Sequence, residues 1–433
     1  MARSFTRRDF LSGSLGVGAA GALHTTLGPL GSRVRSAPAK RASATAGAGA
    51  TTKAVTNTKR KVDRALVLCT LYGGNDGLNT VVPYESSAYR QLRGDIAIPG
   101  DQVLPLGSVD GLKLGLNPAM VGLKALWEAG QVAIILGTGY PDPNLSHFES
   151  MEIMQTADPS GDSPSGWIGR WLDVTGSNPL RALSVGPNVP QVFAGSRQQA
   201  STLADSTNPG SQDPGGDPHF TAAYRTLEHP FRREAVLEAA VAQSGANLLV
   251  VGAKADAALT REQPPRAISP NDPGDIGNQL DIVAALIKAD LPTKAYGVMT
   301  GSFDTHMNQL QGQGEMLSQV DAGIQNFMGD FPTVSSGLSP VIVVYSEFGR
   351  RAQSNASGGT DHGTASNVIV VGPSVKGGFY SESPSLRRLD ENGNLVHTVD
   401  FRRVYATVLA EIMGVDPKGF LGGRRYPTIP FLA

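Results

Sequence analysis

Acidic and histidine side chains recur in glycine-rich turns that directly follow apolar, strand-like runs. Asp76 lies in the turn after Ala65–Leu71, and Asp304 and His306 follow Ala295–Met299. Carboxylates and imidazoles bind divalent metals in sites that contain no thiolates. In open α/β sheets, ligands bind beyond the carboxyl ends of the strands, where loops from several strands meet. The recurrence therefore predicts one shared site that holds a metal.

Two short motifs place histidine beside aspartate. Asp304 and His306 are two residues apart, so an extended chain would point both side chains to one face, as two ligands of one metal require. Asp361 and His362 stand among glycines, which leave room for a close approach, and the aspartate can orient the ring. The alternatives are helix capping by Asp304 and a solvated loop histidine at position 362. We predict that all four side chains belong to the metal site.

Glu347 and Arg350 follow a third strand-like run, Val341–Tyr345. The glutamate could ligate the metal, and the arginine could hold an anionic oxygen through two hydrogen bonds. A surface Glu–Arg pair that contributes little to stability is the alternative. Asp76 also has a plainer interpretation, because Asn, Asp and Gly form turns without any chemistry.

Ser146 is the predicted nucleophile. It follows the run Val132–Leu136 and stands where a helix is expected to begin, so backbone N–H groups and the helix dipole would favour an anion there. A metal could activate its hydroxyl. Serine is also an ordinary helix cap, which is the alternative role. The neighbouring His147 is predicted to act in catalysis, as a proton-transfer group or as a ligand.

The segments between these turns predict the elements that must position the site. Apolar runs alternate with helical patterns, which predicts an α/β fold with a mostly parallel central sheet and helices on both faces. Besides the runs above, strands are predicted at Ala182–Val185, Gln191–Phe193 and Asn367–Val371. Helices are predicted at Ser86–Arg93, Pro118–Gly130, Leu145–Thr156, Trp167–Val174, Phe220–Ala253, Ile276–Asp290, His306–Phe331 and Phe401–Met413.

Charge and cysteine content exclude several classes of protein. The 433 residues include 37 Lys and Arg against 38 Asp and Glu, so the chain lacks the net basicity that attracts nucleic acid. Cys69 is the only cysteine, so it cannot form an intramolecular disulfide. Its place in an apolar run predicts a packed core thiol rather than a nucleophile.

The N-terminal segment has the layout of an export signal. Arg7 and Arg8 precede a mildly apolar stretch, Leu11–Leu30, which is typical of a twin-arginine signal and too rich in glycine for a permanent membrane span. We therefore expect a periplasmic or secreted protein with no stable membrane span after signal removal. The expected organisation is a signal peptide, a disordered linker and a single α/β domain, at residues 1–39, 40–61 and 62–433.

Several phrases of the sequence together resemble a bacterial family known as domain of unknown function 1501, whose members are often exported by the twin-arginine route. The matching phrases extend over nearly all of the chain after the linker. They are GGNDGLNTVVPY at 73–84, GYPDPNLSHFESMEIMQT at 139–156, GWIGRWLD at 166–173, GSFDTHMNQ at 301–309, YSEFGRR at 345–351, GGTDHGTASNVIVVGPSVKGGFY at 358–380 and DFRRVYATVLAEIMG at 400–414.

The resemblance implies an alkaline phosphatase-like fold, because the family is placed in that superfamily. Superfamily enzymes carry, in chain order, an acidic ligand, a nucleophile at a helix start, an Asp/His ligand group, an Asp-His pair and a late histidine. The residues that look like these are, in turn, Asp76, Ser146, Asp304 with His306, Glu347 and His362. Phe348 stands where the pair would have its histidine, and phenylalanine cannot ligate a metal. The resemblance therefore implies one metal ion, or a different mixed oxygen and nitrogen site, rather than a full two-zinc site.

Two functions from different classes follow as hypotheses. The first is an exported metal-dependent hydrolase of phosphate or sulfate esters, acting on a small-molecule or glycan ester with Zn, Mn, Mg or Ca. The second is an exported binding or assembly protein on a degraded hydrolase scaffold. A shared metal requires Asp304 and His362 to lie within about 10 Å of each other on the same side of the sheet.

Overall fold

The computed structural model describes residues 63–186, 188–203, 236–262, 275–334 and 339–433. The chain divides into two units, of which the larger comprises residues 62–214 and 247–433 and contains the sheet and the site. The expected signal peptide and linker, and the loop after residue 203, lie outside the described residues. The single domain 62–433 therefore remains a prediction.

The strands of the described residues form one large sheet and one small one. Those of the large sheet are β1 (Arg64–Leu71), β5 (Val132–Gly139), β6 (Ala182–Val185), β7 (Ser201–Leu203), β8 (Ala295–Thr300), β9 (Ser339–Tyr345), β10 (Ser366–Val371), β11 (Gly378–Tyr380) and β12 (Val399–Asp400). Those of the small sheet are β2 (Val81–Val82), β3 (Leu104–Val109) and β4 (Leu112–Leu116).

The helices vary from one turn to 27 residues in length. They are α2 (Gly77–Thr80), α3 (Ser87–Arg93), α4 (Val121–Glu128), α5 (His147–Thr156), α6 (Trp167–Val174), α8 (Val236–Glu262), α9 (Ile276–Lys288), α10 (Gln309–Asp330) and α11 (Arg402–Glu411). Short 3₁₀ turns occur at Gly94–Ile96, Gln191–Phe193 and Pro417–Gly419. No helix in these ranges is both long and apolar enough to cross a membrane.

Strand β1 lies inside the large sheet and is buried at all eight positions. The strand order of the large sheet is β11-β5-β10-β9-β1-β8-β6-β7, and β12 also pairs with β5. A strand covered on both faces must be apolar nearly throughout, as β1 is. Its odd-numbered side chains, such as Val67 and Cys69, pack in one core cluster with residues of α4, α9 and α10. The even-numbered Leu66 and Leu68 pack with residues of α5, α6 and α11.

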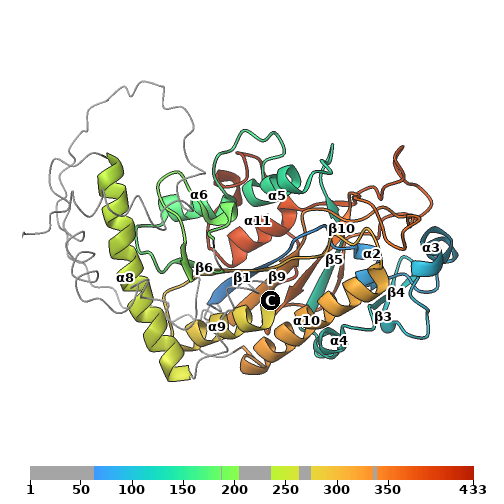
Figure 1. Ribbon diagram of the computed structural model, residues 1–433, viewed down its shortest axis with the longest axis horizontal. Helices are drawn as coiled ribbons and strands as arrows, with labels where there is room; N and C mark the ends of the chain where they lie inside the picture. The colour runs from blue at the N-terminus through green and yellow to red at the C-terminus, as the bar shows by residue number, and fades with distance from the viewer. Residues whose placement is uncertain (1–62, 187, 204–235, 263–274, 335–338) are drawn as a thin grey trace, which may run out of the picture. The chain divides into compact units, whose positions relative to one another are not determined.

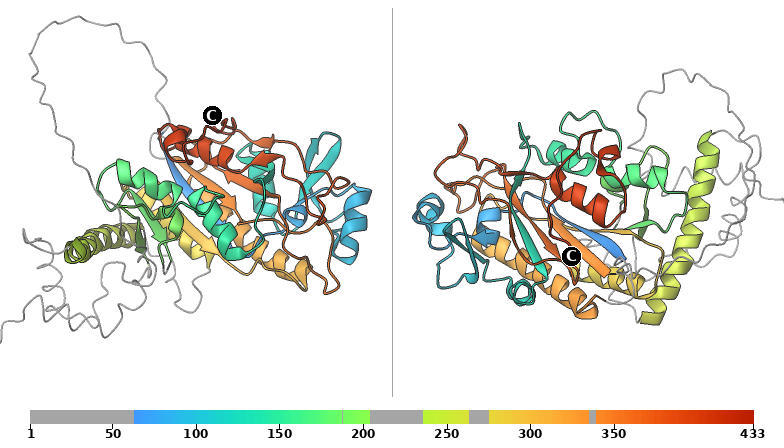
Figure 2. Two further views of the ribbon diagram at one scale, coloured as in Figure 1. Left: turned by 90° about the horizontal axis from the view of Figure 1, so that it is seen from above. Right: turned by 180° about the vertical axis from the view of Figure 1, so that it is seen from behind.

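Figure 1 shows α5, α6 and α11 on one face of the sheet and α4, α9 and α10 on the other, and the view from behind in Figure 2 shows the same two layers. Every strand pair of the large sheet is parallel except the two that involve β10. The predicted α/β fold, with a mostly parallel sheet and helices on both faces, is confirmed.

The helix predicted at Phe220–Ala253 lies partly outside the described residues, and its described part, α8, continues to Glu262. Two further sequence predictions about local structure were wrong. Gln191–Phe193 is a 3₁₀ turn rather than a strand, closed by a hydrogen bond from the Phe193 N–H to the Pro190 carbonyl. An apolar run of three residues is too short for its periodicity to separate the two. The helix predicted from His306 begins at Gln309, because Asn308 adopts a left-handed conformation that separates it from the preceding loop.

The direction of each strand determines which loops meet at one edge of the sheet. Strands β1, β8 and β9 are parallel and in register, so the loops that follow them leave the sheet together. Strand β10 is antiparallel to β9 and to β5, so β10 begins where β9 and β5 end. The segment before β10 therefore meets the loops after β1, β5, β8 and β9 at this edge.

Candidate metal centre

Three imidazoles converge on the carboxylate of Asp304. The Nε2 atoms of His306 and His362 lie 3.0 and 3.1 Å from Oδ1, and the Nε2 atom of His147 lies 3.5 Å from Oδ2. The Nε2 atoms of His306 and His362 are 3.0 Å apart. Ligand atoms of His147, Asp304 and His362 all lie within 4.8 Å of one another, close enough to share one ion. We call His147, Asp304, His306 and His362 the metal centre.

Each of these imidazoles is held from behind through its Nδ1 atom. The acceptors for His147, His306 and His362 are, in this order, Glu347 Oε1 at 2.8 Å, Asp361 Oδ1 at 3.1 Å and the Leu145 carbonyl oxygen at 2.8 Å. An imidazole that donates its Nδ1–H to such an acceptor presents the lone pair of Nε2 to the other side. Protein ligands of metals are commonly held in this way.

This arrangement fits a cation. Two neutral rings with their Nδ1–H groups engaged would bring the Nε2 lone pairs of His306 and His362 within 3.0 Å of each other. A proton on one ring, or a metal ion between them, removes that repulsion. Three imidazole nitrogens with one carboxylate oxygen match the donor preferences of a divalent transition metal.

The surroundings of Asp304 favour the ionised form of its carboxyl group. Burial opposes its ionisation, but the hydrogen bond and charge of Arg350, aided by His362 and His306, lower its pKa to about 2. The centre therefore offers an anionic oxygen throughout the neutral pH range.

We expect Asp304→Asn to destabilise the metal-free protein near neutral pH and to do so less below about pH 4. The folded pKa of Asp304, about 2, lies below its ordinary value of 3.8. Ionised Asp304 thus stabilises the fold above the ordinary value, and this contribution is lost as the pH falls toward the folded pKa. Urea unfolding of both proteins between about pH 7 and pH 3 measures the difference. A difference that grows on acidification would contradict the prediction.

The loop that carries His362 is paired with the loop that follows β9. His362 forms an antiparallel bridge with Arg350, and the Gly363 N–H donates to the Gly349 carbonyl at 2.9 Å. A Cβ atom on Gly363 would lie 2.4 Å from the carbonyl carbon of Arg350, so only glycine allows this approach. The pairing places His362 directly beyond the carboxyl end of the sheet.

The loop before α5 is fixed by Asn144, and this fixes His147. The side-chain oxygen of Asn144 accepts from the Ser146 N–H at 2.7 Å, and the Asn144 carbonyl accepts from the Ser150 hydroxyl at 2.6 Å. Ser146 is the N-cap position of α5, but its side chain makes no capping hydrogen bond. Ser146 stands in the sequence between Leu145 and His147, which both contact the site, and its hydroxyl does not cap the helix.

Arg350 was predicted to act on a substrate anion, but its guanidinium is wholly buried. It donates to Asp304 Oδ1 at 2.5 Å and to four backbone carbonyls. These carbonyls belong to Gly73, Gly74, Phe303 and Thr360. The structure thus places Arg350 beneath the metal centre, where it ties the loops after β1 and β8 to the segment before β10.

Asp76 was predicted to be a metal ligand, but its carboxylate is committed elsewhere. Both oxygens accept from Arg93, at 2.5 and 2.7 Å, in an ion pair that is completely buried. The same oxygens accept from the Leu78 N–H and the Gln309 amide. Asp76 is thus the N-cap of α2 and part of a buried network, as the turn interpretation of this segment allowed.

Glu347 and Asp361 lie behind the imidazoles rather than among the ligand atoms. Both oxygens of Glu347 are occupied, Oε1 by His147 and the Gly73 N–H and Oε2 by the Ser346 hydroxyl. Phe348 is buried, and its ring centroid lies 4.9 Å from those of His147 and His362. The Phe348 ring therefore forms an apolar wall against two of the imidazoles.

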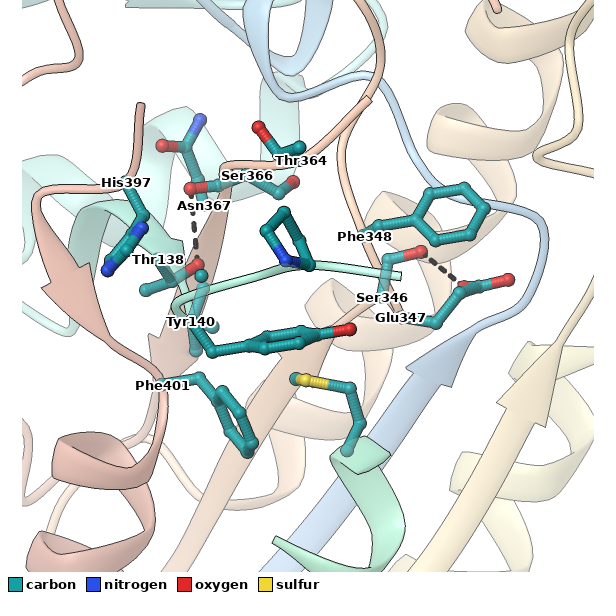
Figure 3. A pocket seen from close by; sticks show the side chains of 14 residues that line it. Thr138, Tyr140, Ser346, Glu347, Phe348, Thr364, Ser366, Asn367, His397 and Phe401 are labelled. Carbon is teal, nitrogen blue, oxygen red and sulfur yellow. Dashed lines mark hydrogen bonds between the residues drawn. The ribbon is translucent and has the colours of Figure 1, made fainter. Parts of the chain in front are cut away.

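A narrow hollow with room for about one water molecule adjoins this wall, and Glu347 and Phe348 form part of its lining. Figure 3 shows Tyr140, Phe401 and His397 around it, together with the hydroxyl groups of Thr138, Thr364 and Ser366. Glu347 is the one carboxylate of the lining, and both of its oxygens are already hydrogen-bonded.

Sequence reasoning gave His147 two possible roles, in proton transfer or as a ligand, and its Nε2 atom lies with the ligand atoms. The sequence did indicate that His147 belongs to the site, since it follows a strand and begins a helix. Ser146 stands at the same place, so the pattern could not tell which of the two residues has which role. Sequence reasoning missed Arg93, Gln309 and Leu145 entirely. Leu145 acts through its backbone carbonyl, which any residue has, and Arg93 and Gln309 stand in segments without a recognisable motif. No sequence pattern could therefore have identified them.

Comparison with known proteins identifies two segments of the chain. A family model described as "Protein of unknown function (DUF1501)" matches residues 131–425. A model of the twin-arginine translocation pathway signal sequence matches residues 4–24, which confirms the predicted export to the periplasm. No curated protein matches the sequence.

Three solved structures illustrate what the fold is similar to. Phosphonoacetate hydrolase from Sinorhizobium meliloti 1021 is 13% identical, with 67% of this chain and 57% of that chain covered and a TM-score of 0.25. The soluble domain of lipooligosaccharide phosphoethanolamine transferase A from Neisseria meningitidis is 9% identical, with 83% and 90% covered and a TM-score of 0.35. A phosphonate monoester hydrolase from Silicibacter pomeroyi is 10% identical, with 81% and 73% covered and a TM-score of 0.32. Likenesses at these scores establish neither a shared active site nor a shared substrate.

Proposed function

This chain belongs to the DUF1501 family of proteins of unknown function, and for it we propose an exported metal-dependent hydrolase of phosphate or sulfate esters on an alkaline phosphatase-like scaffold. The observation that supports this most is the convergence of three Nε2 atoms on Asp304 beside the N-terminus of α5. A cation and a helix N-terminus that lie next to each other can both bind the anionic oxygens of such an ester.

The proposed cofactor is one divalent ion. Four residues, His147, Asp304, His306 and His362, would hold it. Because imidazoles suit Zn, and oxygen ligands suit Mn, Mg and Ca, this donor set favours Zn over Mn, Mg or Ca. The wall at Phe348 supports one ion rather than two.

The residues around the centre would then have distinct parts in the reaction. A bound divalent ion there would polarise an ester oxygen and lower the pKa of a coordinated hydroxyl. The free N–H groups of the first turn of α5 would hold other oxygens of the anion. Ser146 Oγ would form a bond to phosphorus or sulfur as the bond to the leaving oxygen breaks, and water would cleave the resulting enzyme ester.

We expect the metal-loaded protein to hydrolyse an aryl phosphate, phosphodiester or sulfate ester, and Ser146→Ala to lower kcat by about 10³-fold without releasing the metal. Ser86 offers a matched control, because it caps α3 and its hydroxyl accepts from the Tyr89 N–H. Ser86→Ala should lower stability slightly and leave kcat unchanged. Steady-state kinetics and elemental analysis of the three proteins make the test. A metal-loaded protein that cleaves none of the substrates would reject the hydrolase.

A second candidate function is an exported binding or assembly protein. Two large apolar side chains beside the centre favour it, since Phe148 is 89% exposed and Met307 is 64% exposed. Exposed apolar side chains next to a site are common where a partner docks. In that case Phe148→Ser should abolish binding of a glycan or protein partner, while the metal stays bound and no ester is cleaved.

A further inference from the structure

Gln309, the first residue of α10, is completely buried and joins three separate segments. Its Nε2 donates to Asp76 Oδ2 at 2.5 Å. Its Oε1 accepts from the hydroxyls of Thr360 at 2.5 Å and Thr305 at 3.2 Å. Its backbone N–H donates to the Gly358 carbonyl at 2.9 Å. One side chain thus connects the turn after β1, the loop after β8 and the segment before β10.

Two of these segments carry ligand atoms of the metal centre. Thr305 lies between Asp304 and His306 in the sequence, and Thr360 lies two residues before His362. The Thr360 N–H also donates to the Thr305 carbonyl at 3.2 Å. The distance between the two loops at the position of Gln309 therefore affects the distance between His306 and His362.

The contact between these loops is tight. A Cβ atom on Gly359 would lie 2.3 Å from the carbonyl carbon of His306. The Asn355 amide donates both to the His306 carbonyl at 2.9 Å and to Asp361 Oδ1 at 3.2 Å. With so little free space, a change in one loop shifts the other.

The third segment gives Gln309 a fixed support. Asp76 is held by two hydrogen bonds from Arg93 in a pair with no exposed side-chain surface. Gln309 needs a donor toward this carboxylate and an acceptor toward two hydroxyls, and a carboxamide supplies both. A glutamate there would place a second anion against Asp76.

We propose that Gln309 is a positioning residue for the metal centre, acting through Thr305 and Thr360 to set the separation of the His306 and His362 Nε2 atoms. Asp76 then serves the centre as the support of Gln309. The proposal rests on the part of the proposed function that concerns the bound metal and does not depend on the identity of the ester.

Metal affinity of the exported chain tests the proposal. Zn²⁺ binding is measured by competition with a chromophoric chelator, and the visible absorption of bound Co²⁺ reports the geometry of the ligands. We expect Gln309→Ala to weaken Zn²⁺ binding by about 10–100-fold, as the loss of a group that orients ligands does, and to change the Co²⁺ spectrum. Thr360→Val, which removes one hydroxyl at nearly constant volume, should weaken binding in the same direction.

Gln313→Ala is the matched control. Gln313 lies one turn later on α10, is equally buried, and donates to Asn75 Oδ1 and the Asp76 carbonyl. It contacts the turn after β1 through these bonds, but neither is to a segment that carries a ligand. Its replacement should lower stability and leave Zn²⁺ affinity and the Co²⁺ spectrum unchanged.

Each outcome decides between the proposals. If Gln309→Ala binds Zn²⁺ as tightly as the wild type, the positioning role is overturned. If Gln309→Ala does not fold, the same result in Thr360→Val overturns it. Equal losses in Gln309→Ala and Gln313→Ala would also overturn it, because general destabilisation would then explain both. Weakened binding in a chain that hydrolyses no ester would support the positioning role and reject the hydrolase. A wild-type chain that binds neither metal would reject both.

Discussion

His362→Ala should remove the metal from the protein and leave the fold intact. Its Nε2 atom is one of the four proposed ligand atoms, and its Nδ1 contact with the Leu145 carbonyl brings the start of α5 to the centre. We expect metal content to fall from about one ion per chain to below about a tenth, and turnover to fall by about 10³-fold. The hydrophobic core does not include this loop, so the far-UV spectrum of the metal-free protein should not change.

Elemental analysis of protein exported in its native host measures this prediction. His397→Ala is the matched control, because His397 is another half-buried loop histidine and lies outside the metal centre. The control should keep its metal. A full equivalent of metal in His362→Ala would show that His362 is not a ligand and would remove the main support for the hydrolase.

Arg350→Ala should cause the largest loss of stability of any single replacement near the site. Four carbonyls would lose a charged hydrogen-bond donor inside the protein, and Asp304 would lose its partner. Each buried carbonyl left without a donor costs about 1–3 kcal/mol. The lost pairing with Asp304 adds less, because the Asp304 side chain is 45% exposed. We therefore expect a free energy of unfolding lower by at least about 3 kcal/mol.

Arg351→Ala is the control for this replacement. Arg351 is the next residue and half-buried, and its side chain acts on Asp361 and Asp390 through its charge alone. Its loss should change stability by less than about 1 kcal/mol. Urea unfolding of the metal-free proteins gives both values. Should Arg350→Ala be as stable as the wild type while kcat falls, Arg350 acts on the substrate, as the sequence alone suggested.

Hydrophobic patterning predicted most of the fold because burial on both faces of a sheet leaves a clear record in the sequence. Strand β1 is apolar along its length, and α6 was predicted with its observed bounds. The direction of β10 could not be predicted, since an antiparallel strand in the middle of a sheet has the same composition as a parallel one. That direction is decided by pairing with β9 and β5, which are distant in the sequence.

The location of the site could be predicted better than the part of each residue in it. Acids and histidines at strand ends indicated the right edge of the sheet for Asp304, His306 and His362. The same types of residue also serve as supports, and the difference depends on which atoms face one another. Asp76 faces Arg93, which lies 17 positions later in the sequence and showed no pattern that linked the two.

The order of events in the cell follows from where the four ligand residues stand in the chain. Positions 147, 304, 306 and 362 come together only when the loop after β8 and the segment before β10 have both been made and packed. The twin-arginine signal directs the protein to a route that carries folded chains. The centre would thus be complete on the cytoplasmic side, before translocation. The cytoplasmic supply of metal ions, rather than that of the periplasm where the protein works, would then decide which ion it carries.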